Sequence, residues 1–383
     1  MSYWNGKDFL RFIFTSFFGN RGTNYRLTGK RLGILLLCLV LYLPAELLIW
    51  SGLALDELFY PAYHQIKIQQ PVFIIGNPRS GTTYLHRLLA RDRQNFLSMQ
   101  TWEIFGAPSI LVRKVLRFVV RIARGLGIRI SRQIQGLERT WKENDPIHRL
   151  KLRAPEEDEY LFIHNFSTMK VWSYAAMEEQ AEPYIYFDEM ISDGDKERMM
   201  SFYESCLQRH YFSHGEKNRH YLSKNPNFSP AIKTLLEAFP DGKFIYLIRN
   251  PLKAIPSHIS LKEREWQLLG SPLEEYACRD FIIRSSEHWY RYPLETLKDL
   301  PENQQVVIRF DDLVSDTKGT VEEIYQRLDL ELTPEFRDTL ELESISARNH
   351  QSQHQYSIQE MGIDTQAFEE KFTEIMKEYQ LRK

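Results

Sequence analysis

The longest apolar stretch of the chain lies near its amino end. Leu32–Leu55 is 24 residues long and is apolar apart from Glu46 and a few small or neutral polar groups. About 20 such residues can span a bilayer, and the stretch starts too late and runs too long for an ordinary signal peptide. Pro44 and Glu46 interrupt it, since a proline favours a kink and a buried charge is costly. The pattern predicts one spanning helix, an interfacial or re-entrant hairpin bent at Pro44, or a buried core hairpin.

A second segment, 110–133, combines apolar residues with seven basic residues and no acid. Its arginines at 113, 117, 121 and 124 follow helical spacing and are expected to share one face. Such a helix can lie on an anionic lipid leaflet, or it can be a core helix with a solvated basic face. Together, the two segments predict association with a membrane surface.

The charges before the apolar stretch bear on membrane sidedness. Six basic residues precede it: Lys7, Arg11, Arg21, Arg26, Lys30 and Arg31. The positive-inside rule then keeps the amino end in the cytosol. Because anionic lipid also faces the cytosol, we expect the hairpin, with the domain that follows it in the cytosol. A single spanning helix would instead place that domain in a lumen or outside the cell.

Beyond residue 58, short apolar runs alternate with longer helical patterns. Strands are predicted at 71–75, 243–248 and 306–310, and helices at 82–90, 281–297, 320–328 and 365–379. This alternation predicts an α/β fold with a central parallel sheet flanked by helices. The chain is therefore divided into an amino-terminal region, 1–57, and one domain, 58–383.

The composition excludes some classes of function. The net charge is −2, so no global basic field points to nucleic acid. The three cysteines, Cys38, Cys206 and Cys278, are widely spaced and form neither a disulfide framework nor a metal-binding pattern. The composition does not indicate an oligomeric state.

The stretch "PVFIIGNPRSGTTYLHRLL", residues 71–89, carries the clearest chemical signal. It reads as a strand, a loop of small residues and a helix, a context whose backbone N–H groups bind phosphate-like anions. The loop nearly matches the nucleotide motif G-x-x-x-x-G-K-[ST]. However, Thr82 occupies the lysine position and Arg79 provides an earlier cation. No convincing acid for Mg²⁺ accompanies it, so no metal is expected.

"PRSGTT" followed by "LHRLL" resembles the 5′-phosphosulfate loop of sulfotransferases, which use 3′-phosphoadenosine 5′-phosphosulfate (PAPS). Two further matches support this resemblance. "YLIRNPLKAIPS" gives Arg249 and Ser257, eight residues apart, like the family's pair on the 3′-phosphate. Lys224 in "LSKNP" is similar to the lysine near the transferring sulfonate. The resemblance runs from about residue 56 to the end of the chain. It is to the broad P-loop family that includes tyrosylprotein sulfotransferases and bacterial members.

The resemblance implies a role for each matched residue. The 5′-phosphate would be held by Arg79, Ser80, Gly81, Thr82 and Thr83. A sulfuryl group can be transferred by fixed hydrogen-bond donors and one or two cations without a metal, because it carries less charge than a terminal phosphoryl group. The bidentate guanidinium at 249 would suit a dianionic 3′-phosphate and exclude ATP, which lacks that group.

The acceptor hydroxyl also needs a base for its proton. By resemblance to tyrosylprotein sulfotransferases, the candidate is Glu103 in "TWE", 24 residues after Arg79. The rival is His148, in the place of the histidine of cytosolic sulfotransferases, with His164 behind it. The acidic cluster 156–158 is expected to be a supporting network or an acid-rich helix start.

Two departures from the family affect the acceptor and the donor. The Arg-Lys-Gly loop of cytosolic sulfotransferases is missing, and Arg348 and Asn349 are candidates to replace it. The apolar amino-terminal segment suggests a lipid, sterol or glycolipid alcohol as acceptor. The competing functions are a P-loop phosphotransferase and a non-catalytic nucleotide-binding membrane protein.

Overall fold

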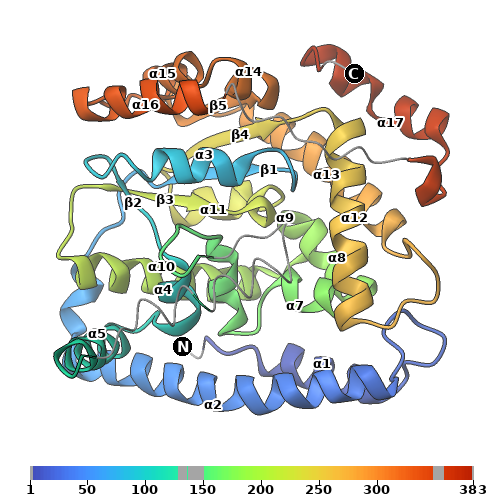
Figure 1. Cartoon of the computed structure of the whole chain (residues 1–383), viewed down its shortest axis with the longest axis horizontal. Coiled ribbons are helices and arrows are strands. Elements are labelled where there is room, and N and C mark those ends of the chain that lie inside the picture. Colours follow the sequence, from blue (N-terminus) through green and yellow to red (C-terminus); the bar gives the residue numbers. More distant parts are fainter. Residues whose placement is uncertain (1–2, 128–135, 137–150, 348–357, 382–383) are drawn as a thin grey trace.

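Five parallel strands form the centre of the computed structural model, which describes residues 3–127, 136, 151–347 and 358–381 (Figure 1). Their order in the sheet is β2-β3-β1-β4-β5. The strands are β1 (Val72–Gly76), β2 (Phe96–Leu97), β3 (His220–Lys224), β4 (Lys243–Ile248) and β5 (Gln305–Arg309). The central strand β1 pairs with β3 on one side and β4 on the other. The predicted α/β fold with a parallel sheet is confirmed.

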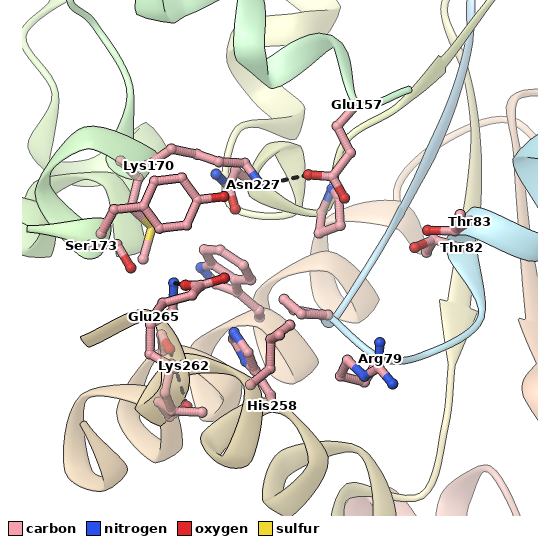
Figure 2. Close-up of a pocket in the computed structure, with 18 of the residues that line it drawn as sticks. Arg79, Thr82, Thr83, Glu157, Lys170, Ser173, Asn227, His258, Lys262 and Glu265 are labelled. Atoms are coloured by element: carbon pink, nitrogen blue, oxygen red, sulfur yellow. Dashed lines mark hydrogen bonds and ion pairs between the residues drawn. The ribbon is translucent and has the colours of Figure 1, made fainter. Parts of the chain in front are cut away.

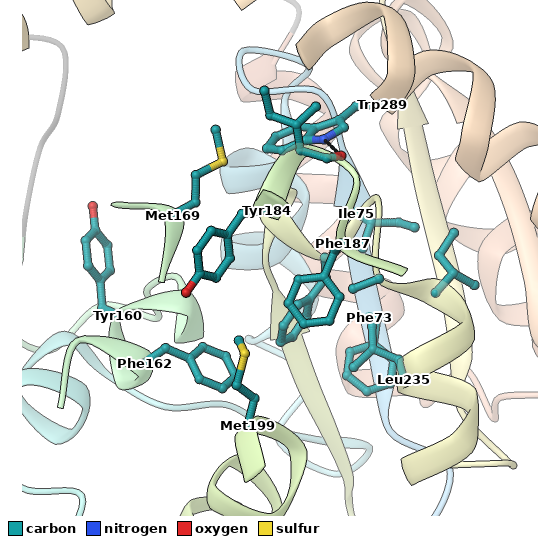
Figure 3. Close-up of a cluster of buried hydrophobic side chains, with 14 of the residues drawn as sticks. Phe73, Ile75, Tyr160, Phe162, Met169, Tyr184, Phe187, Met199, Leu235 and Trp289 are labelled. Atoms are coloured by element: carbon teal, nitrogen blue, oxygen red, sulfur yellow. Dashed lines mark hydrogen bonds between the residues drawn. The ribbon is translucent and has the colours of Figure 1, made fainter. Parts of the chain in front are cut away.

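Alternate side chains of β1 enter two separate cores, as the pleat of a strand requires. Val72 and Ile74 face a smaller core with the helices α3, α15 and α16. Phe73 and Ile75 face a larger core that extends away from the sheet into the helices around it (Figure 3). Because both faces are covered, all five residues of β1 are buried.

Helices cover both faces of the sheet (Figure 1). Over the smaller core lie α3 (Thr82–Leu89), α14 (Phe310–Ser315), α15 (Thr317–Arg327) and α16 (Pro334–Ala347). Around the larger core lie α4 (Thr101–Gly106), α5 (Ile110–Gly125), α7 (Met169–Tyr174), α8 (Glu178–Ile185), α9 (Phe187–Met190), α10 (Asp193–His214), α11 (Ile232–Ala238), α12 (Pro251–Leu269), α13 (Arg279–Leu297) and α17 (Thr365–Glu378). Single 3₁₀ turns are η1 (Pro61–Gln65), η2 (Asp158–Ile163), η3 (Pro226–Phe228), η4 (Glu302–Gln304) and η5 (Gln359–Met361).

The amino-terminal helices α1 (Gly6–Phe17) and α2 (Gly29–Phe59) lie along the edge of the larger core farthest from the sheet (Figure 1). Among the described residues, α2 is the one helix long and apolar enough to cross a membrane, a property that core helices and signal sequences can share. It is continuous over 31 residues, with Pro44 inside it. The predicted hairpin bent at Pro44 is therefore wrong.

The continuity of α2 has a physical cause in the contacts on either side of Pro44. The Tyr42 hydroxyl donates to the carbonyl of Ile163 at 2.8 Å, and Trp50 Nε1 donates to the carbonyl of His164 at 2.9 Å. These bonds hold both halves of the helix against the same stretch of the domain. They offset the backbone hydrogen bond that a proline removes.

The predicted basic helix exists as α5, but its cations do not all share one environment. Arg113 is fully buried, and only the cations further along the helix are exposed. Its guanidinium donates to the Ala107 carbonyl at 2.5 Å and contacts His210 Nδ1 at 2.7 Å. Helical spacing places these side chains on one face of α5. Neighbouring helices cover the part of that face where Arg113 lies and bury its side chain. The expectation of one common basic face is corrected at this position.

Candidate active site

The loop between β1 and α3 has a backbone that two glycines make possible. Gly76 has φ 143°, and a Cβ there would lie 2.4 Å from the Leu247 carbonyl oxygen on the neighbouring strand. Gly81 has φ 91°, and a Cβ there would meet the Phe310 ring at 2.6 Å. Between them, Arg79 also adopts a positive φ, of 70°. A non-glycine residue in this conformation is uncommon and is often found at functional sites.

The amino end of α3 suits an anion. Gly81 is its N-cap, and no side chain caps the helix there. The first N–H groups of a helix have no acceptor within the helix, and the helix dipole adds partial positive charge. Ser80 and Thr82 are buried beside this end, whereas Arg79 and Thr83 are only partly buried. The predicted phosphate loop thus has an open backbone cradle, and this geometry fits a phosphate or phosphosulfate group.

Three residues predicted from two separate motifs lie together at this loop. Arg79 Nε donates to Ser257 Oγ at 3.1 Å. Arg249 donates from its guanidinium to the Arg79 carbonyl at 2.6 Å, and the same guanidinium stacks on the Phe310 ring at 4.3 Å. The structure therefore brings the pair expected on the 3′-phosphate into contact with the loop expected on the 5′-phosphate.

Lys224, at the end of β3, connects the loop to an acidic partner. Its Nζ lies 3.3 Å from Thr83 Oγ1 and 2.8 Å from Glu157 Oε1. The other carboxylate oxygen of Glu157 accepts from Lys170 Nζ at 2.5 Å. Burial alone would raise the pKa of Glu157, but the charges of Lys170 and Lys224 outweigh it and hold this pKa well below its usual range. Glu157 is therefore ionised at neutral pH.

Thr83, Glu157 and Lys170 line one cavity between the loop and helices α7, α12 and α13 (Figure 2), whereas Lys224, Arg249 and Ser257 are not among its lining residues. Arg79, Thr82 and Thr83 enter it from the loop, and Glu157 and Lys170 enter from the other side. Helix α12 adds His258, Lys262 and Glu265. Burial, followed by the charges of Lys262 and Arg79, holds the pKa of His258 well below its usual range, so its imidazole is neutral.

Sequence reasoning missed Lys170, His258 and Lys262. The last two follow Ser257 in α12, and residues 258, 262 and 265 have the spacing of one helical face. That periodicity could have identified the α12 wall once Ser257 was assigned. No comparable signal marks Lys170, whose role depends on its contact with Glu157, 13 residues before it in the chain.

Glu103 lies in a different buried cluster. It is at the first turn of α4, where one oxygen accepts from the Gln100 backbone N–H at 2.9 Å. The other oxygen lies 3.0 Å from His214 Nε2 and 3.5 Å from an Arg113 nitrogen. Burial alone would raise the pKa of Glu103, but His210, His214 and Arg113 outweigh it and lower this pKa strongly.

The cluster of Glu103, His210 and His214 has the ligand types and closeness of a metal site. Arg113 contacts both Glu103 and His210, so the cluster already has a cation beside two of its three members. Glu103 and His214 also line a second cavity, together with Arg87, which borders the first cavity as well. The two cavities are neighbours, although Glu103 does not line the one that contains Arg79.

Of the remaining predicted candidates, only His164 lies among the described residues, and it does not line the first cavity. His148, Arg348 and Asn349 lie outside the described residues. His164 has both ring nitrogens in contact with other groups, Glu46 at 2.7 Å and the Ile104 carbonyl at 2.8 Å. It links α2 to α4.

A family model described as "Sulfotransferase family" matches residues 71–334, and the chain belongs to this family. The match includes the loop, Lys224, Arg249 and Ser257. The predicted family resemblance is confirmed, and membership implies a sulfate donor.

Curated relatives include the omega-hydroxy-beta-dihydromenaquinone-9 sulfotransferases Stf3 of Mycobacterium bovis and Mycobacterium tuberculosis. Each is 25% identical over 262 residues, which cover 68% of this chain and 63% of the relative. The match thus spans less than two thirds of these relatives.

Two solved structures share the fold. Sulfotransferase STF1 from Mycobacterium tuberculosis has a TM-score of 0.69 at 16% identity, with 97% of this chain and 94% of that chain covered. Sulfotransferase STF9 from Mycobacterium avium has a TM-score of 0.67 at 19% identity, with 86% and 82% covered. At these identities the likeness supports the fold alone.

Proposed function

We propose that the protein transfers a sulfuryl group from PAPS to a hydroxyl group of a lipid. The observation that carries this proposal is the contact of Arg79 with both Ser257 and Arg249 at an uncapped helix end. Two motifs far apart in the sequence thereby meet, which supports a single anion-binding surface. A Walker-type nucleotide site would instead need a lysine at position 82, where the chain has threonine.

In this proposal the donor carries the sulfuryl group and two phosphate positions, and the chain supplies fixed charges around them. The backbone of Ser80–Thr83 and the side chain of Arg79 hold the 5′-phosphate. Arg249 and Ser257 hold the 3′-phosphate. Because Arg79 and Ser257 are already hydrogen-bonded at 3.1 Å, donor binding replaces that bond by contacts to the two anionic groups.

Lys224 then stabilises the charge on the leaving oxygen, and Glu157 accepts the proton of the acceptor. Lys224 neutralises the oxygen that is released when the sulfur–oxygen bond to the 5′-phosphate breaks. As its Nζ turns to the donor, the carboxylate oxygen it held at 2.8 Å becomes available. That oxygen accepts the proton of the acceptor hydroxyl, whose oxygen forms the new bond to sulfur.

We therefore assign the role of base to Glu157. Glu103, which the sequence predicted as the base, is the alternative. Glu157 lines the cavity with Arg79 and Thr83, whereas Glu103 lines the neighbouring one. The low pKa of Glu157 makes it a weak base while two lysines surround it. The negative charge of a bound donor offsets those lysines and raises the pKa of Glu157 during the reaction.

A lipid alcohol is the acceptor class that two observations support. The curated relatives act, by name, on a hydroxylated menaquinone. The chain also carries one long apolar helix with a largely exposed surface. The proposal places the protein at a membrane with its catalytic domain in the cytosol, where the sulfate donor is made.

The test uses the full chain, radiolabelled PAPS and a membrane lipid extract. We expect label in the organic phase without added metal, and tight binding of 3′,5′-adenosine bisphosphate. In Arg79→Ala and Arg249→Ala, loss of one charge-assisted contact should weaken that binding roughly ten- to hundredfold. Tight binding of ATP with Mg²⁺, or donor binding with no transfer to any lipid fraction, would overturn the proposal.

A further inference from the structure

The side of α2 that faces the domain is bonded to it along the whole helix. Near its start, the buried Arg31 donates to the carbonyls of Ala175 and Leu269 at 3.0 and 3.2 Å. Near its middle, Glu46 lies 2.7 Å from His164 Nδ1. Near its end, both oxygens of Asp56 accept backbone N–H groups from the first turn of α5, at 2.8 and 2.9 Å.

These bonds are incompatible with a helix that stands across a bilayer. A spanning α2 would leave the domain, and Arg31, Glu46 and Asp56 would lose their buried partners. Each unpaired buried charge costs several kcal/mol. The helix also contacts α5 closely, since a Cβ on Gly52 would lie 2.5 Å from a Val112 methyl group. Helix α2 is therefore a part of the domain wall that lies lengthwise along it.

The opposite side of the same helix is exposed and apolar. Only 17% of its most apolar 18-residue stretch is buried. Helices α1 and α5 continue this surface, and we call the exposed apolar residues of the three helices the apolar face. It consists of Leu10, Phe14, Leu32, Leu36, Leu37, Val40, Leu41, Leu43, Leu47, Leu48, Leu55, Leu58, Phe59, Val115, Leu116, Phe118, Val119 and Ile122.

Helix α2 lies against α5, where Gly52 meets Val112, and next to α1 (Figure 1). Trp4, just before α1, meets Trp50 of α2 with the two rings 6.1 Å apart, and Phe9 of α1 and Tyr42 of α2 both pack on Phe166. Helix α2 lies along the base of the molecule in Figure 1, with α1 beside it and α5 at its carboxyl end. Contiguous exposed apolar surfaces of this extent are rare on monomeric soluble proteins and mark an interaction site.

The charges around the apolar face identify its partner. The described residues of segments 3–60 and 110–125 expose one acid, Glu57. They also expose the cations Lys7, Arg11, Arg21, Arg26, Lys30, Lys114, Arg117, Arg121 and Arg124. A second copy of the chain would bring two basic surroundings together. An anionic lipid leaflet offers acyl chains for the leucines and head groups for the cations.

We infer that α1, α2 and α5 dock the protein on the surface of an anionic membrane, with α2 lying in the plane of the leaflet instead of crossing it. This inference does not depend on the proposed reaction, because it concerns binding to lipid. It does explain how a cytosolic cavity can be next to a lipid substrate. The Arg31 bonds lie at Ala175, just after α7, and Leu269, the end of α12, and both helices line the cavity.

The first experiment is flotation of the full chain with lipid vesicles, in the absence of donor. Binding is expected to vesicles rich in phosphatidylglycerol, to be weaker with phosphatidylcholine alone, and to decrease with salt. The variant Leu37→Ser/Val40→Ser/Leu41→Ser should bind roughly tenfold or more weakly, because it removes exposed apolar groups. The matched control is Met190→Ser/Leu342→Ser, two exposed apolar residues outside the face, which should bind like the wild type.

Both variants should still bind 3′,5′-adenosine bisphosphate. This binding shows that a variant is folded, so that weaker vesicle binding is a loss of docking and not of folding. Equal vesicle binding by the two variants would overturn the inference. A salt-independent dimer that is disrupted by the α2 substitutions and ignores vesicles would overturn it too, in favour of a second copy.

The second experiment separates a helix in the leaflet plane from a spanning helix. Cys38 is exposed on α2, whereas Cys206 and Cys278 are buried, so a polarity-sensitive thiol dye labels the helix selectively. On binding to vesicles, we expect a blue shift and stronger quenching by lipid spin labels placed near the head groups than at the bilayer centre. The reverse order of quenching would show a spanning helix and overturn the inference.

Discussion

Two buried carboxylates, Glu157 and Glu103, lie in neighbouring cavities, and both are kept ionised by cations. Glu157 contacts two lysines, Lys170 and Lys224, whose side chains are long and flexible. Glu103 contacts a histidine and the fully buried Arg113, and it also accepts a backbone N–H of its own helix start. A strongly lowered pKa therefore occurs in both, and it does not by itself distinguish a reactive carboxylate from a structural one.

The difference lies in what each partner can do when a ligand arrives. Lys224 also contacts Thr83 of the phosphate loop, so an anion bound there competes directly with Glu157 for the lysine. Arg113 also binds the Ala107 carbonyl and His210, and the whole cluster holds α4, α5 and α10 together. The contacts of Arg113 therefore stabilise the fold. Lys224, in contrast, is shared between Thr83 and Glu157, and it links donor binding to the availability of a base.

The largest effect on turnover is expected from Glu157→Gln. If Glu157 accepts the acceptor proton, the rate of sulfuryl transfer should fall roughly 10²- to 10⁴-fold. Binding of 3′,5′-adenosine bisphosphate should be retained or strengthened, because Lys224 loses its closer carboxylate partner and keeps Glu156, at 3.7 Å. Steady-state kinetics measures the rate of transfer, and calorimetric titration measures the affinity for 3′,5′-adenosine bisphosphate. Turnover at the wild-type rate would contradict the role of Glu157 and favour Glu103 as the base.

Glu103→Gln should act chiefly on stability. Removal of one partner from a buried ion pair costs about 3–5 kcal/mol of unfolding free energy. Because the pKa of Glu103 is lowered in the folded state, its contribution is present above the unfolded pKa and is lost as the pH falls through the folded one. Denaturant unfolding checks the stability, and turnover per folded molecule should stay near the wild-type value. A 10²-fold loss of turnover in fully folded variant would contradict the structural assignment.

Lys170→Met should have an intermediate effect that tests the electrostatic part of the comparison. It removes one of the two cations that lower the pKa of Glu157, so that pKa should rise. The acid limb of the pH–rate profile should move to higher pH, with turnover at neutral pH within roughly tenfold of the wild type. The matched control is Lys196→Met, a lysine on α10 outside both cavities, which should leave the profile unchanged.

The smallest effect on turnover is expected from Asp158→Asn, next to Glu157 in the chain. Burial raises the pKa of Asp158 to about 7, although Tyr203 donates a hydrogen bond that lowers it. A raised folded-state pKa gives stability that is present below the unfolded value and is lost as the pH rises towards 7. In denaturant titrations, the free energy of unfolding of the wild type should decrease as the pH rises towards 7, whereas that of Asp158→Asn should not. If the stability of the wild type and of Asp158→Asn depends on pH in the same way, Asp158 does not have a raised pKa, and its contrast with Glu157 fails.

The elements around the site could be predicted from the sequence, because they follow local rules. The strand 243–248 has the predicted bounds, and the loop with its following helix is where the glycines and small residues indicated. Arg79, Arg249 and Ser257 were recognised in separate motifs, and the fold brings them into contact. Their joint position follows from the rule that parallel strands end at the same edge of a sheet.

The partners of the acids and the path of α2 could not be predicted. In the acidic cluster 156–158, two lysines hold Glu157, whereas Asp158 accepts hydrogen bonds from tyrosines, and the packing of α7, α10 and β3 creates this difference. Pro44 and Glu46 suggested a bend because the sequence does not show His164, which lies opposite Glu46. Whether His148 has a role stays a prediction, as does the division of the chain at residue 57.

The bonds of Arg31 have a practical consequence for anyone who wants a soluble form of the protein. Deletion of residues 1–57 would remove an apolar helix, but it would also take Ile49 and Leu53 out of the larger core. The carbonyls of Ala175 and Leu269, at the ends of two helices that line the cavity, would lose their donor. A truncated chain would thus have a new apolar opening beside its reaction site. Polar substitutions on the exposed side of α2 leave these contacts in place and are the better route to a soluble enzyme.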